Sequence, residues 1–488
     1  MKTVRYTTLY IISMLLLISC KDFLDIPKEG SFNAGEMDFT KKENMFLPVS
    51  NVYASMRSNN AHGFPYIGIC EVVSDDADKG STPSDSQTMI ELDGFTYGPN
   101  NGLFNEFWDG CFGMISSANN AIETLVKFEP ILRTDADWSE YKGMVAESKF
   151  LRAYAYFNLV RTFGDVPLIN KTLTSEELIQ LKRISKEDIY AFIHNDLDVG
   201  INDLPDYYSK EWAGRVTKYA AMALKAKVSL YQEKFDEVLK YTDMIIESAQ
   251  YDLYPNFYKL FRVEQENCVE SLFELQSSTL GKIDGEVTYC EYAYYQGPRS
   301  NSPSNMQGWG FKVPSQKLID FLNERGETDR IKATIMVRGT KTDEGDSIKT
   351  ICVNPYYNMK VYTTSSQNKW KSNGYGFDHN IRLLRYADVL LMNAEAKVHK
   401  GMDASEPLNR VRARVHLEPV SNPTLEDVYD ERRAELALEE NRFFDLVRTG
   451  RAPQVLSSLG FKAGKHELFP VPQKQIQLNP NLTQNNNY

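Results

Sequence analysis

Two amphipathic helices joined by about three residues constrain the fold of this chain more than any other feature. They lie in TKYAAMALKAKVSLYQEKFDEVLKYTDMIIESA, residues 217–249, where apolar side chains recur at steps of three and four. The first stripe is Ala220, Ala223, Leu224 and Tyr231, and the second is Phe235, Val238, Leu239, Ile245 and Ala249. So short a connection makes two helices fold back antiparallel. Because the alanines allow close approach, we expect a tetratricopeptide-like helical hairpin.

Other segments also have helical periodicity. In VAESKFLRAYAYFNLVRTFGDVPLI, residues 145–169, Gly164 and Pro167 end a predicted helix. Its apolar or small stripe is Ala146, Phe150, Ala153, Phe157 and Val160. RLLRYADVLLMNAEAKVHKG, residues 382–401, is a further alanine-rich candidate. A hydroxyl three residues before an acid marks helix starts at Ser185 with Asp188 and at Thr424 with Asp427. No strict repeat period is visible, but the pattern predicts a mainly α-helical chain.

The predicted secondary structure changes between about residues 250 and 375. Short β-prone pieces separated by Gly, Asn, Ser and Pro replace the helical stripes, namely SLFELQ, KATIMVRG and NMKVYT. Long polar loops inside a compact domain are commonly functional. We therefore divide the chain into a helical part, 20–249, and a C-terminal part, 250–488, which holds ligand-binding loops at about 270–315 and returning helices.

The N-terminus has the layout of a secretory signal. Lys2 and Arg5 precede LYIISMLLLIS, an apolar run too short to cross a bilayer, and no later window supplies a membrane span. Residues 17–20, LISC, resemble the lipobox of bacterial lipoproteins, in which the signal is removed before the cysteine and the thiol is acylated. We expect residues 1–19 to be a lipoprotein signal peptide and Cys20 to carry the lipid anchor. The alternative is a secreted protein whose cysteine lies there by chance.

The net charge limits the kinds of binding partner, and the cysteine count bears on disulfides and metal sites. The net charge is −11, and loss of Lys2 and Arg5 with the signal takes it to −13, which argues against nucleic acid and against a basic membrane-binding face. The lipid must then hold the protein at the membrane. The remaining cysteines are Cys70, Cys111, Cys268, Cys290 and Cys352. Since their number is odd, at least one is a free thiol, and no spacing predicts a zinc site.

The sequence contains no catalytic or cofactor motif. It has no zincin histidine pair, nucleophile elbow, phosphate-binding loop or dinucleotide fingerprint, and no carboxylate pair stands out as a glycosidase site. SDDADKGSTPSDSQ resembles a calcium loop with Asp76 and Asp78 as the ligands at its first and third positions. However, Ser81 replaces the required glycine and Gln87 the bidentate glutamate. We predict a non-enzymatic protein without a cofactor, with calcium as the weaker alternative to a solvated or ligand-facing loop.

Acids and arginines alternate at helical steps in ERRAELALEENRFFDLVRTG, residues 431–450. Pairs three residues apart are Arg432 with Glu435, Glu439 with Arg442, Arg442 with Asp445, and Asp445 with Arg448. Exposed pairs each contribute only a few tenths of a kcal/mol. So dense an alternation beside Phe443 and Phe444 favours a partly buried network at a helix crossing. We expect a structural use, with ligand contact as the minor interpretation.

Aromatic side chains gather in TYCEYAYYQGPRSNSPSNMQGWGFKVP, residues 288–314. They are Tyr289, Tyr292, Tyr294, Tyr295 and Trp309, interleaved with amide and hydroxyl groups. Flat apolar rings beside such groups suit a sugar, which has an apolar C–H face and a rim of hydroxyls. The alternative is that several rings belong to the core, with Tyr292 and Tyr294 on one face of a strand and Trp309 packed on a helix over 315–324.

Five stretches together resemble the SusD/RagB family of outer-membrane lipoproteins. They are SCKDFLDIPKEG; FWDGCFGMISSANNAIE; AESKFLRAYAYFNLVRTFGDVPLI; RLLRYADVLLMNAEA with LNRVRARVHL; and ERRAELALEENRFFDLVRTG running to FPVPQKQIQLNPNLTQNNNY. They span the whole mature chain in the family's order. The resemblance implies a helical scaffold of tetratricopeptide-like pairs, with irregular loops and short β-strands forming a shallow ligand surface.

The resemblance also implies a function. A member of this family would be lipid-anchored on the outer face of the outer membrane, capture an oligosaccharide and close like a lid over a SusC-like TonB-dependent transporter, without performing chemistry. Family members bind ligand through the region after the SDD stretch and through the middle third. The expected ligand-binding residues are therefore Asp75, Asp76, Asp78, Tyr289, Tyr292, Tyr295 and Trp309.

Two other functions stay open. RagB-like members serve peptide uptake, so the cargo could be an oligopeptide, which a flatter and more charged surface would favour. A purely structural partner of the transporter, with no small ligand, is the second alternative. The aromatic cluster favours an oligosaccharide.

Overall fold

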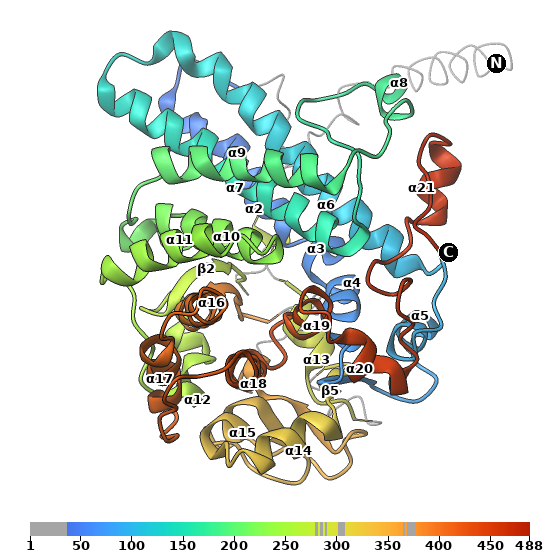
Figure 1. Ribbon diagram of the computed structural model, residues 1–488. Helices are drawn as coiled ribbons and strands as arrows, with labels where there is room; N and C mark the ends of the chain where they lie inside the picture. Colours follow the sequence, from blue (N-terminus) through green and yellow to red (C-terminus); the bar gives the residue numbers. More distant parts are fainter. Residues whose placement is uncertain are drawn as a thin grey trace, which may run out of the picture.

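The helices follow one another through space nearly in chain order. The computed structural model describes residues 37–278, 282–283, 286–287, 290–300, 308–364, 367 and 377–488. Its principal helices are α2 (Phe46–Met56), α6 (Gly102–Leu125), α7 (Asp135–Phe163), α9 (Lys186–Asp203), α10 (Lys218–Tyr231), α11 (Phe235–Glu247), α16 (Tyr386–His399), α17 (Ser405–Arg414) and α18 (Leu425–Leu436). Each helix from α2 to α11 packs on the next of these, and α16 packs on α11, α17 and α18 (Figure 1). The prediction of a mainly α scaffold is confirmed.

Shorter elements connect and cover this scaffold. The short helices are α3 (Asn59–His62), α4 (Phe64–Ile67), α5 (Gln87–Asp93), α8 (Ser175–Leu178), α12 (Phe257–Leu260), α13 (Tyr292–Gln296), α14 (Gln316–Glu324), α15 (Thr328–Thr334), α19 (Arg442–Arg448), α20 (Ala452–Leu456) and α21 (Gln473–Leu478). Strands pair antiparallel as β1 (Ala77–Gly80) with β5 (Phe311–Pro314), β2 (Ser271–Leu275) with β8 (Ile381–Arg385), β3 (Lys282–Ile283) with β4 (Glu286–Val287), and β6 (Ile335–Val337) with β7 (Tyr356–Asn358). The β-structure of the described residues is thus limited to two-stranded pairs.

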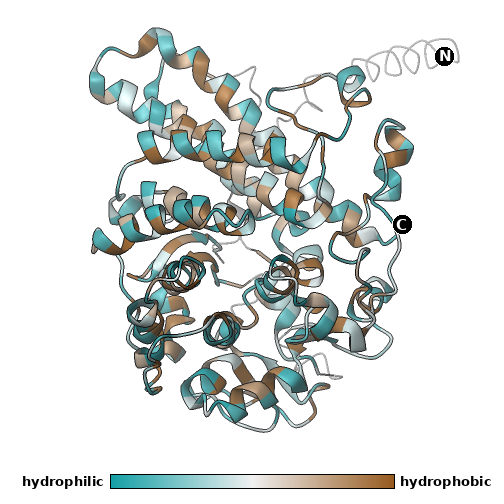
Figure 2. Cartoon of the chain, in the orientation of Figure 1, coloured by the Kyte–Doolittle hydropathy of each residue, from teal (hydrophilic) through white to brown (hydrophobic). Residues whose placement is uncertain are grey.

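The predicted hairpin is confirmed as α10 and α11. The helices pack on each other across a three-residue connection, and the alanines of α10 are fully buried. Most principal helices alternate hydrophilic and hydrophobic residues along their length (Figure 2), as amphipathic helices between a core and water must. The prediction that Ala249 belongs to the second helical stripe is wrong. The α11 helix ends at Glu247, and Ala249 is exposed in a left-handed conformation.

The predicted helix starts at Ser185 and Thr424 and the predicted helix end at Gly164 are confirmed. The α7 helix ends at Phe163, and Gly164 takes the positive φ of 72° that stops it. The Thr424 side chain accepts a hydrogen bond from the Asp427 backbone N–H while the Asp427 side chain accepts one from the Thr424 backbone, a complete capping box. Ser185 caps α9 in the same way through the Asp188 N–H. All members of the predicted α7 stripe are buried.

Two of the three predicted β-prone pieces are largely wrong. SLFELQ forms β2 as expected. In KATIMVRG the first residues belong to α15, and only Ile335–Val337 is a strand. NMKVYT becomes a 3-10 turn after β7, because the Asn358 side chain accepts from the Lys360 N–H and the Arg262 guanidinium donates to the Met359 carbonyl at 2.8 Å. Tertiary hydrogen bonds here override local β propensity.

A buried network of arginines and carboxylates joins the C-terminal helices to the rest of the chain. At its centre, the Glu435 carboxylate of α18 receives Arg330 of α15 at 2.9 Å, Arg385 of β8 at 2.5 Å, and Arg414 of α17. Arg385 and Arg414 also bind Glu270, 2.8 and 2.6 Å away, just before β2. All of these charged groups are almost completely buried. The prediction of a structural network is confirmed.

Most of its predicted partners are wrong. Of the expected pairs three residues apart, Asp445 and Arg448 form the pair the sequence suggested, at 2.7 Å. Arg432 instead binds Asp388 at 2.8 Å and Arg442 binds Asp75 at 2.7 Å. The break between α18 and α19, where Leu438 and Glu440 have positive φ, separates Glu439 from Arg442. Within α18 and α19 themselves, these two arginines bind carboxylates of other segments in preference to the acid three residues away.

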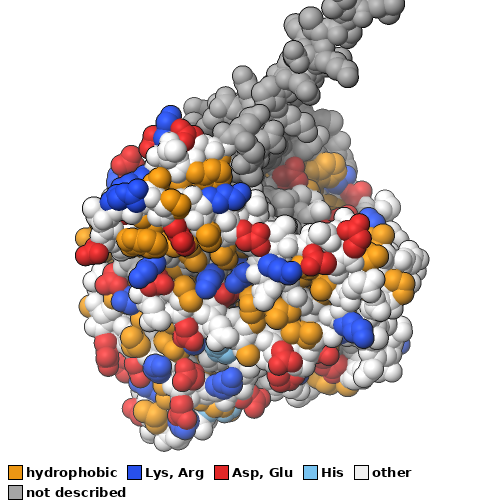
Figure 3. Space-filling model, turned by 90° about the horizontal axis from the view of Figure 1, so that it is seen from above, with side chains coloured by type: hydrophobic (Ala, Val, Ile, Leu, Met, Phe, Trp, Pro, Cys, Tyr) orange, Lys and Arg blue, Asp and Glu red, His pale blue; other side chains and the backbone are white. Residues whose placement is uncertain are grey.

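The surface has a mixed character on the face seen in Figure 3. Acidic and basic side chains are interspersed there with exposed hydrophobic ones, so no single charge dominates that face. Within the described parts of the chain, no helix is both long and apolar enough to cross a membrane. All five cysteines of the described part are free thiols.

Removing the charge at the centre of the network should destabilise the fold. For Glu435→Gln we expect a loss of about 3 to 5 kcal/mol in the free energy of unfolding, because three guanidiniums lose the carboxylate that neutralises them while buried. Glu426→Gln is the control, since Glu426 pairs with Arg451 at 2.6 Å but its side chain is 62% exposed, and it should cost less than about 1 kcal/mol. Urea unfolding curves measure both, and equal losses would contradict the central role of Glu435.

The Glu435 carboxyl should also make the stability of the fold depend on pH in the acid range. Burial alone would raise the pKa of Glu435, but the guanidiniums of Arg414, Arg385 and Arg330 hold it well below its ordinary 4.5. A lowered pKa contributes stability that is present above the unfolded-state pKa and is lost as the pH falls toward the folded-state pKa. The stability difference between wild type and Glu435→Gln should therefore shrink from about pH 5 to about pH 3. A constant difference in urea titrations over that range would refute this.

Candidate functional site

Pairing of β1 with β5 brings together the two segments predicted to bind ligand. The register places Ala77 opposite Pro314 and Gly80 opposite Phe311. One residue beyond β1, the Ser81 N–H donates to the Gly310 carbonyl at 2.5 Å. The loop after the SDD stretch therefore lies beside Trp309, although more than two hundred residues separate them in the chain.

The backbone fixes the position of Trp309. Its N–H donates to the Tyr294 carbonyl of α13 at 3.0 Å. A Cβ on Gly308 would lie 2.5 Å from that same carbonyl oxygen, and Gly310 has a φ of 68°. Only glycine fits at the first position, and glycine is strongly favoured at the second. The two glycines around the tryptophan thus serve a close approach of two backbone segments, which holds the half-buried ring in place.

An ion pair borders the Trp309 ring. The Arg299 guanidinium lies 5.1 Å from the ring centroid, within range of a cation–π interaction. Its Nη1 is 2.5 Å from the Asp85 carboxylate and 2.9 Å from the Ser81 hydroxyl. Partial burial raises the pKa of Asp85, but hydrogen bonds from Ser81 and Thr82 and the Arg299 cation more than offset it and leave the pKa lowered. Asp85 is therefore ionised at neutral pH.

Tyr295 supplies a second half-buried ring. It packs on Phe64 with ring centroids 5.0 Å apart, and Phe64 in turn packs edge-to-face on Phe311 at 4.9 Å. The Tyr295 hydroxyl donates to Glu291 at 2.6 Å. We call Tyr295, Arg299, Trp309 and Asp85 the Trp309 surface. The Trp309 ring lies beside the Arg299–Asp85 ion pair, and Tyr295 follows the Tyr294 carbonyl that accepts from the Trp309 N–H. Partly exposed rings close to such polar groups can bind a polyhydroxylated ligand.

Tyr292 lies away from this surface. It belongs to helix α13, not to the strand proposed as the alternative, and it is 4% exposed. Its hydroxyl donates to Glu440 at 2.7 Å and accepts from Lys312 at 3.0 Å, so the ring is part of a buried polar cluster. The geometry favours a structural role. Tyr289 and Cys20 lie outside the described residues, and their roles stay predictions.

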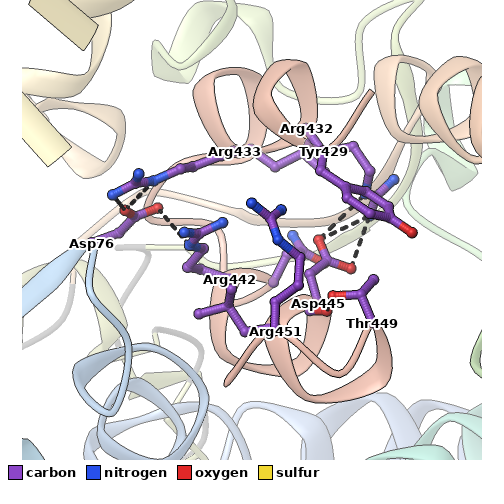
Figure 4. A pocket seen from close by; sticks show the side chains of 11 residues that line it. Asp76, Tyr429, Arg432, Arg433, Arg442, Asp445, Thr449 and Arg451 are labelled. Atoms are coloured by element: carbon purple, nitrogen blue, oxygen red, sulfur yellow. Dashed lines mark hydrogen bonds and ion pairs between the residues drawn. The ribbon is translucent and has the colours of Figure 1, made fainter. Parts of the chain in front are cut away.

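Asp75 and Asp76 are buried and bound to arginines of the C-terminal helices. Asp75 lies 2.7 Å from Arg442 and 3.0 Å from Arg433, and Asp76 lies 2.7 Å from Arg433. Figure 4 shows Arg433 and Arg442 pointing at Asp76. The neighbouring pocket holds only about 20 Å³, room for roughly one water. These carboxylates anchor β1 to α18 and α19, a structural role that leaves no space for a sugar.

Asp78 is exposed, on the outward face of β1. Within the described part of the chain, no three His, Cys, Asp or Glu side chains form a group that could hold a metal ion. Because residues 77–80 form a strand and Asp76 is bound to Arg433, the stretch does not have the course of a calcium loop. Calcium binding remains an untested prediction.

Sequence reasoning missed Arg299, Asp85 and Phe64. Arg299 lies inside the aromatic-rich stretch 288–314 and Asp85 inside SDDADKGSTPSDSQ, but nothing in the sequence pairs them across 214 residues. Phe64 sits in a short helix after Gly63 and carries no pattern of its own. A search for charged residues inside aromatic-rich loops would have found Arg299.

Comparisons with known proteins agree with this architecture. The model of the SusD family matches residues 269–459, and a model described as starch-binding associating with outer membrane matches residues 34–230. SusD-like protein P2 of Formosa agariphila is 26% identical over 99% of this chain and 99% of its own. Starch-binding protein SusD of Bacteroides thetaiotaomicron is 25% identical over 70% of this chain and 72% of its own.

A solved structure extends the match to three dimensions. A laminarin binding SusD-like protein superimposes with a TM-score of 0.80 at 28% identity, covering 91% of this chain and 99% of that one. Two family models in the expected order, full-length relatives and the shared fold lead to one conclusion. The chain belongs to the SusD family.

Proposed function

We propose that this protein is a cell-surface glycan-binding lipoprotein that captures an oligosaccharide and delivers it to a SusC-like TonB-dependent transporter. The observation that carries the proposal is the Trp309 ring, held half-buried beside the Arg299–Asp85 ion pair. The names of two relatives support the ligand class, since one binds starch and the other laminarin. The family description that matches residues 34–230 supports association with the outer membrane.

The Trp309 surface suits capture without reaction. Trp309 and Tyr295 offer apolar faces for sugar C–H groups, and Arg299 and Asp85 offer a donor and an acceptor for hydroxyls. Because the Trp309 ring already packs on the Tyr294 ring and on the Arg299 guanidinium, little side-chain entropy is lost on binding. The surface needs no nucleophile or metal for this task, so we propose binding and no catalysis.

Two alternative functions, oligopeptide binding and a purely structural role, would each require a different kind of surface. An oligopeptide ligand would favour a flatter and more charged site than one built around Trp309 and Tyr295. A purely structural partner of the transporter would have no use for a tryptophan mounted between two close-approach glycines. The rigid, half-exposed ring therefore favours an oligosaccharide.

The lipid anchor at Cys20 belongs to the same proposal. It rests on the LISC stretch at 17–20 and on the outer-membrane association of the family. A lipid would explain membrane attachment of a protein whose described helices include none able to span a bilayer.

Truncating Trp309 should weaken glycan binding and spare the fold. We expect Trp309→Ala to lose about 1 to 3 kcal/mol of binding free energy, the range for a desolvated aromatic anchor. Affinity electrophoresis against host and plant glycans, with a peptide mixture as alternative cargo, measures the loss. Tyr292→Ala is the matched control, since its buried ring should instead cost about 3 to 5 kcal/mol of stability. Wild-type binding by Trp309→Ala, or binding of peptides alone, would reject the proposed surface.

Replacing the anchor cysteine should release the protein from membranes. We expect Cys20→Ala to leave the protein soluble or with an uncut signal, because the thiol that takes the lipid is gone. Cys268→Ala is the control, since Cys268 is a half-buried free thiol and should not affect attachment. Cell fractionation and lipid labelling measure both. A Cys20→Ala variant that stays acylated would rule out the anchor.

A further inference from the structure

We propose that a second cleft, between α2 and the loop that follows α9, binds an uncharged oligosaccharide chain. The cleft has a volume of about 640 Å³ and is lined by α2, by residues 211–215 and by the end of β2. Ligand sites of this kind range from about 300 to 1,000 Å³. It shares no residue with the Trp309 surface, and neither the family resemblance nor the names of the relatives assign it.

An exposed tryptophan forms one wall of the cleft. Trp212 ends the 3-10 turn Lys210–Trp212 and is 44% exposed, an unusual position for so large an apolar side chain. Its ring packs edge-to-face on Phe46 of α2 with centroids 5.3 Å apart. The Arg215 guanidinium lies 5.3 Å from the Trp212 ring and 4.4 Å from the Phe46 ring. The tryptophan is thus supported from behind while part of its surface remains open to a ligand.

The loop that carries Trp212 is fixed before any ligand binds. Gly214 has a φ of 93°, and a Cβ there would lie 2.5 Å from the Gln276 side chain, so the loop passes directly against the end of β2. Arg215 is held by the buried Glu147 carboxylate, with its Nε 3.1 Å from the nearer oxygen. The Val216 N–H donates to the Tyr53 hydroxyl of α2 at 2.9 Å. Such a preorganised wall reduces the entropy cost of binding.

The polar groups of the cleft favour a neutral, hydroxyl-rich ligand. Ser50, Asn51 and Gln276 line it with a hydroxyl and two amides, which both donate and accept hydrogen bonds. Two of its charges are already balanced, Arg215 by Glu147 and Glu274 by Arg382 at 3.5 Å. Arg57 and Glu211 also line the cleft and add one charge of each sign, so its lining carries no net charge. An aromatic face beside amides and balanced charges suits a sugar better than an anion, which would require unpaired cations.

The cleft continues past the loop. A second hollow of about 260 Å³ shares Ala213, Gly214 and Arg215 with it and is lined on its far side by Tyr207, which is 76% exposed. Aromatic rings therefore stand on both sides of the 213–215 ridge. This arrangement fits an extended chain of several sugar rings rather than a single monosaccharide.

The inference rests on the proposed function only for the class of ligand. The test below therefore measures ligand binding at the second cleft and at the Trp309 surface separately. The full chain is labelled with fluorotryptophan, and the signals are assigned by single Trp→Phe variants. Fluorine NMR spectra are then recorded with laminarihexaose, maltohexaose, oligosaccharides from the host and plant glycan panel, and a peptide mixture. Trp138 is the control, since it is 38% exposed and packs edge-to-face on Tyr141 at 5.6 Å, but it lies outside both sites.

We expect at least one glycan to shift the Trp212 signal, and to do so in Trp309→Ala as well, while Trp138 stays unchanged. In the same titration, Trp212→Ala should weaken the affinity of the second cleft for the glycan about tenfold. The Tm of the variant and the shift of its Trp309 signal should stay unchanged. A shift of Trp309 alone would overturn the second cleft and leave the proposed function standing. A shift of Trp212 alone would support the cleft and refute the Trp309 surface. No glycan response at either ring, or a Trp212 response to peptides only, would overturn the inference.

Discussion

The meeting of three guanidiniums on the Glu435 carboxylate is the interaction on which the rest of the structure depends. Arg330, Arg385 and Arg414 come from α15, β8 and α17, and each reaches α18 without contact with water. Buried charges are tolerated only when they are paired and hydrogen-bonded, so these elements have little freedom to move apart. Glu270, bound by both Arg385 and Arg414, extends the constraint to β2. The network thereby fixes the returning C-terminal helices against the middle of the chain.

The same C-terminal segment also positions the Trp309 surface. Arg433 and Arg442 bind Asp75 and Asp76 just before β1, and β1 pairs with β5 directly after Trp309. A chain of buried ion pairs and backbone hydrogen bonds thus leads from α18 to the tryptophan. The scaffold and the Trp309 ring are therefore connected by buried contacts. Asp75 and Asp76 serve this connection, while Asp85 lies beside the ring through its ion pair with Arg299.

Both proposed binding places share one physical design. In each, a partly exposed tryptophan is backed by an arginine whose charge is already matched, Arg299 by Asp85 and Arg215 by Glu147. In each, a glycine allows a close backbone approach that fixes the loop. Such sites bind flat, neutral, hydroxyl-rich surfaces with little rearrangement. They are suited to holding a flexible oligosaccharide.

The sequence by itself determined the helical scaffold, because the period of apolar side chains, the short connection after α10 and the caps at Thr424 and Gly164 are local signals. It also indicated the aromatic loop and the presence of a charge network. Only the tertiary structure decided which acid meets which arginine, since Arg442 binds Asp75 although Asp445 lies three residues away in the same helix, α19. It also decided that Tyr292 is buried while Trp309 is half-exposed. Burial and pairing depend on segments hundreds of residues apart, and local periodicity carries no information about them.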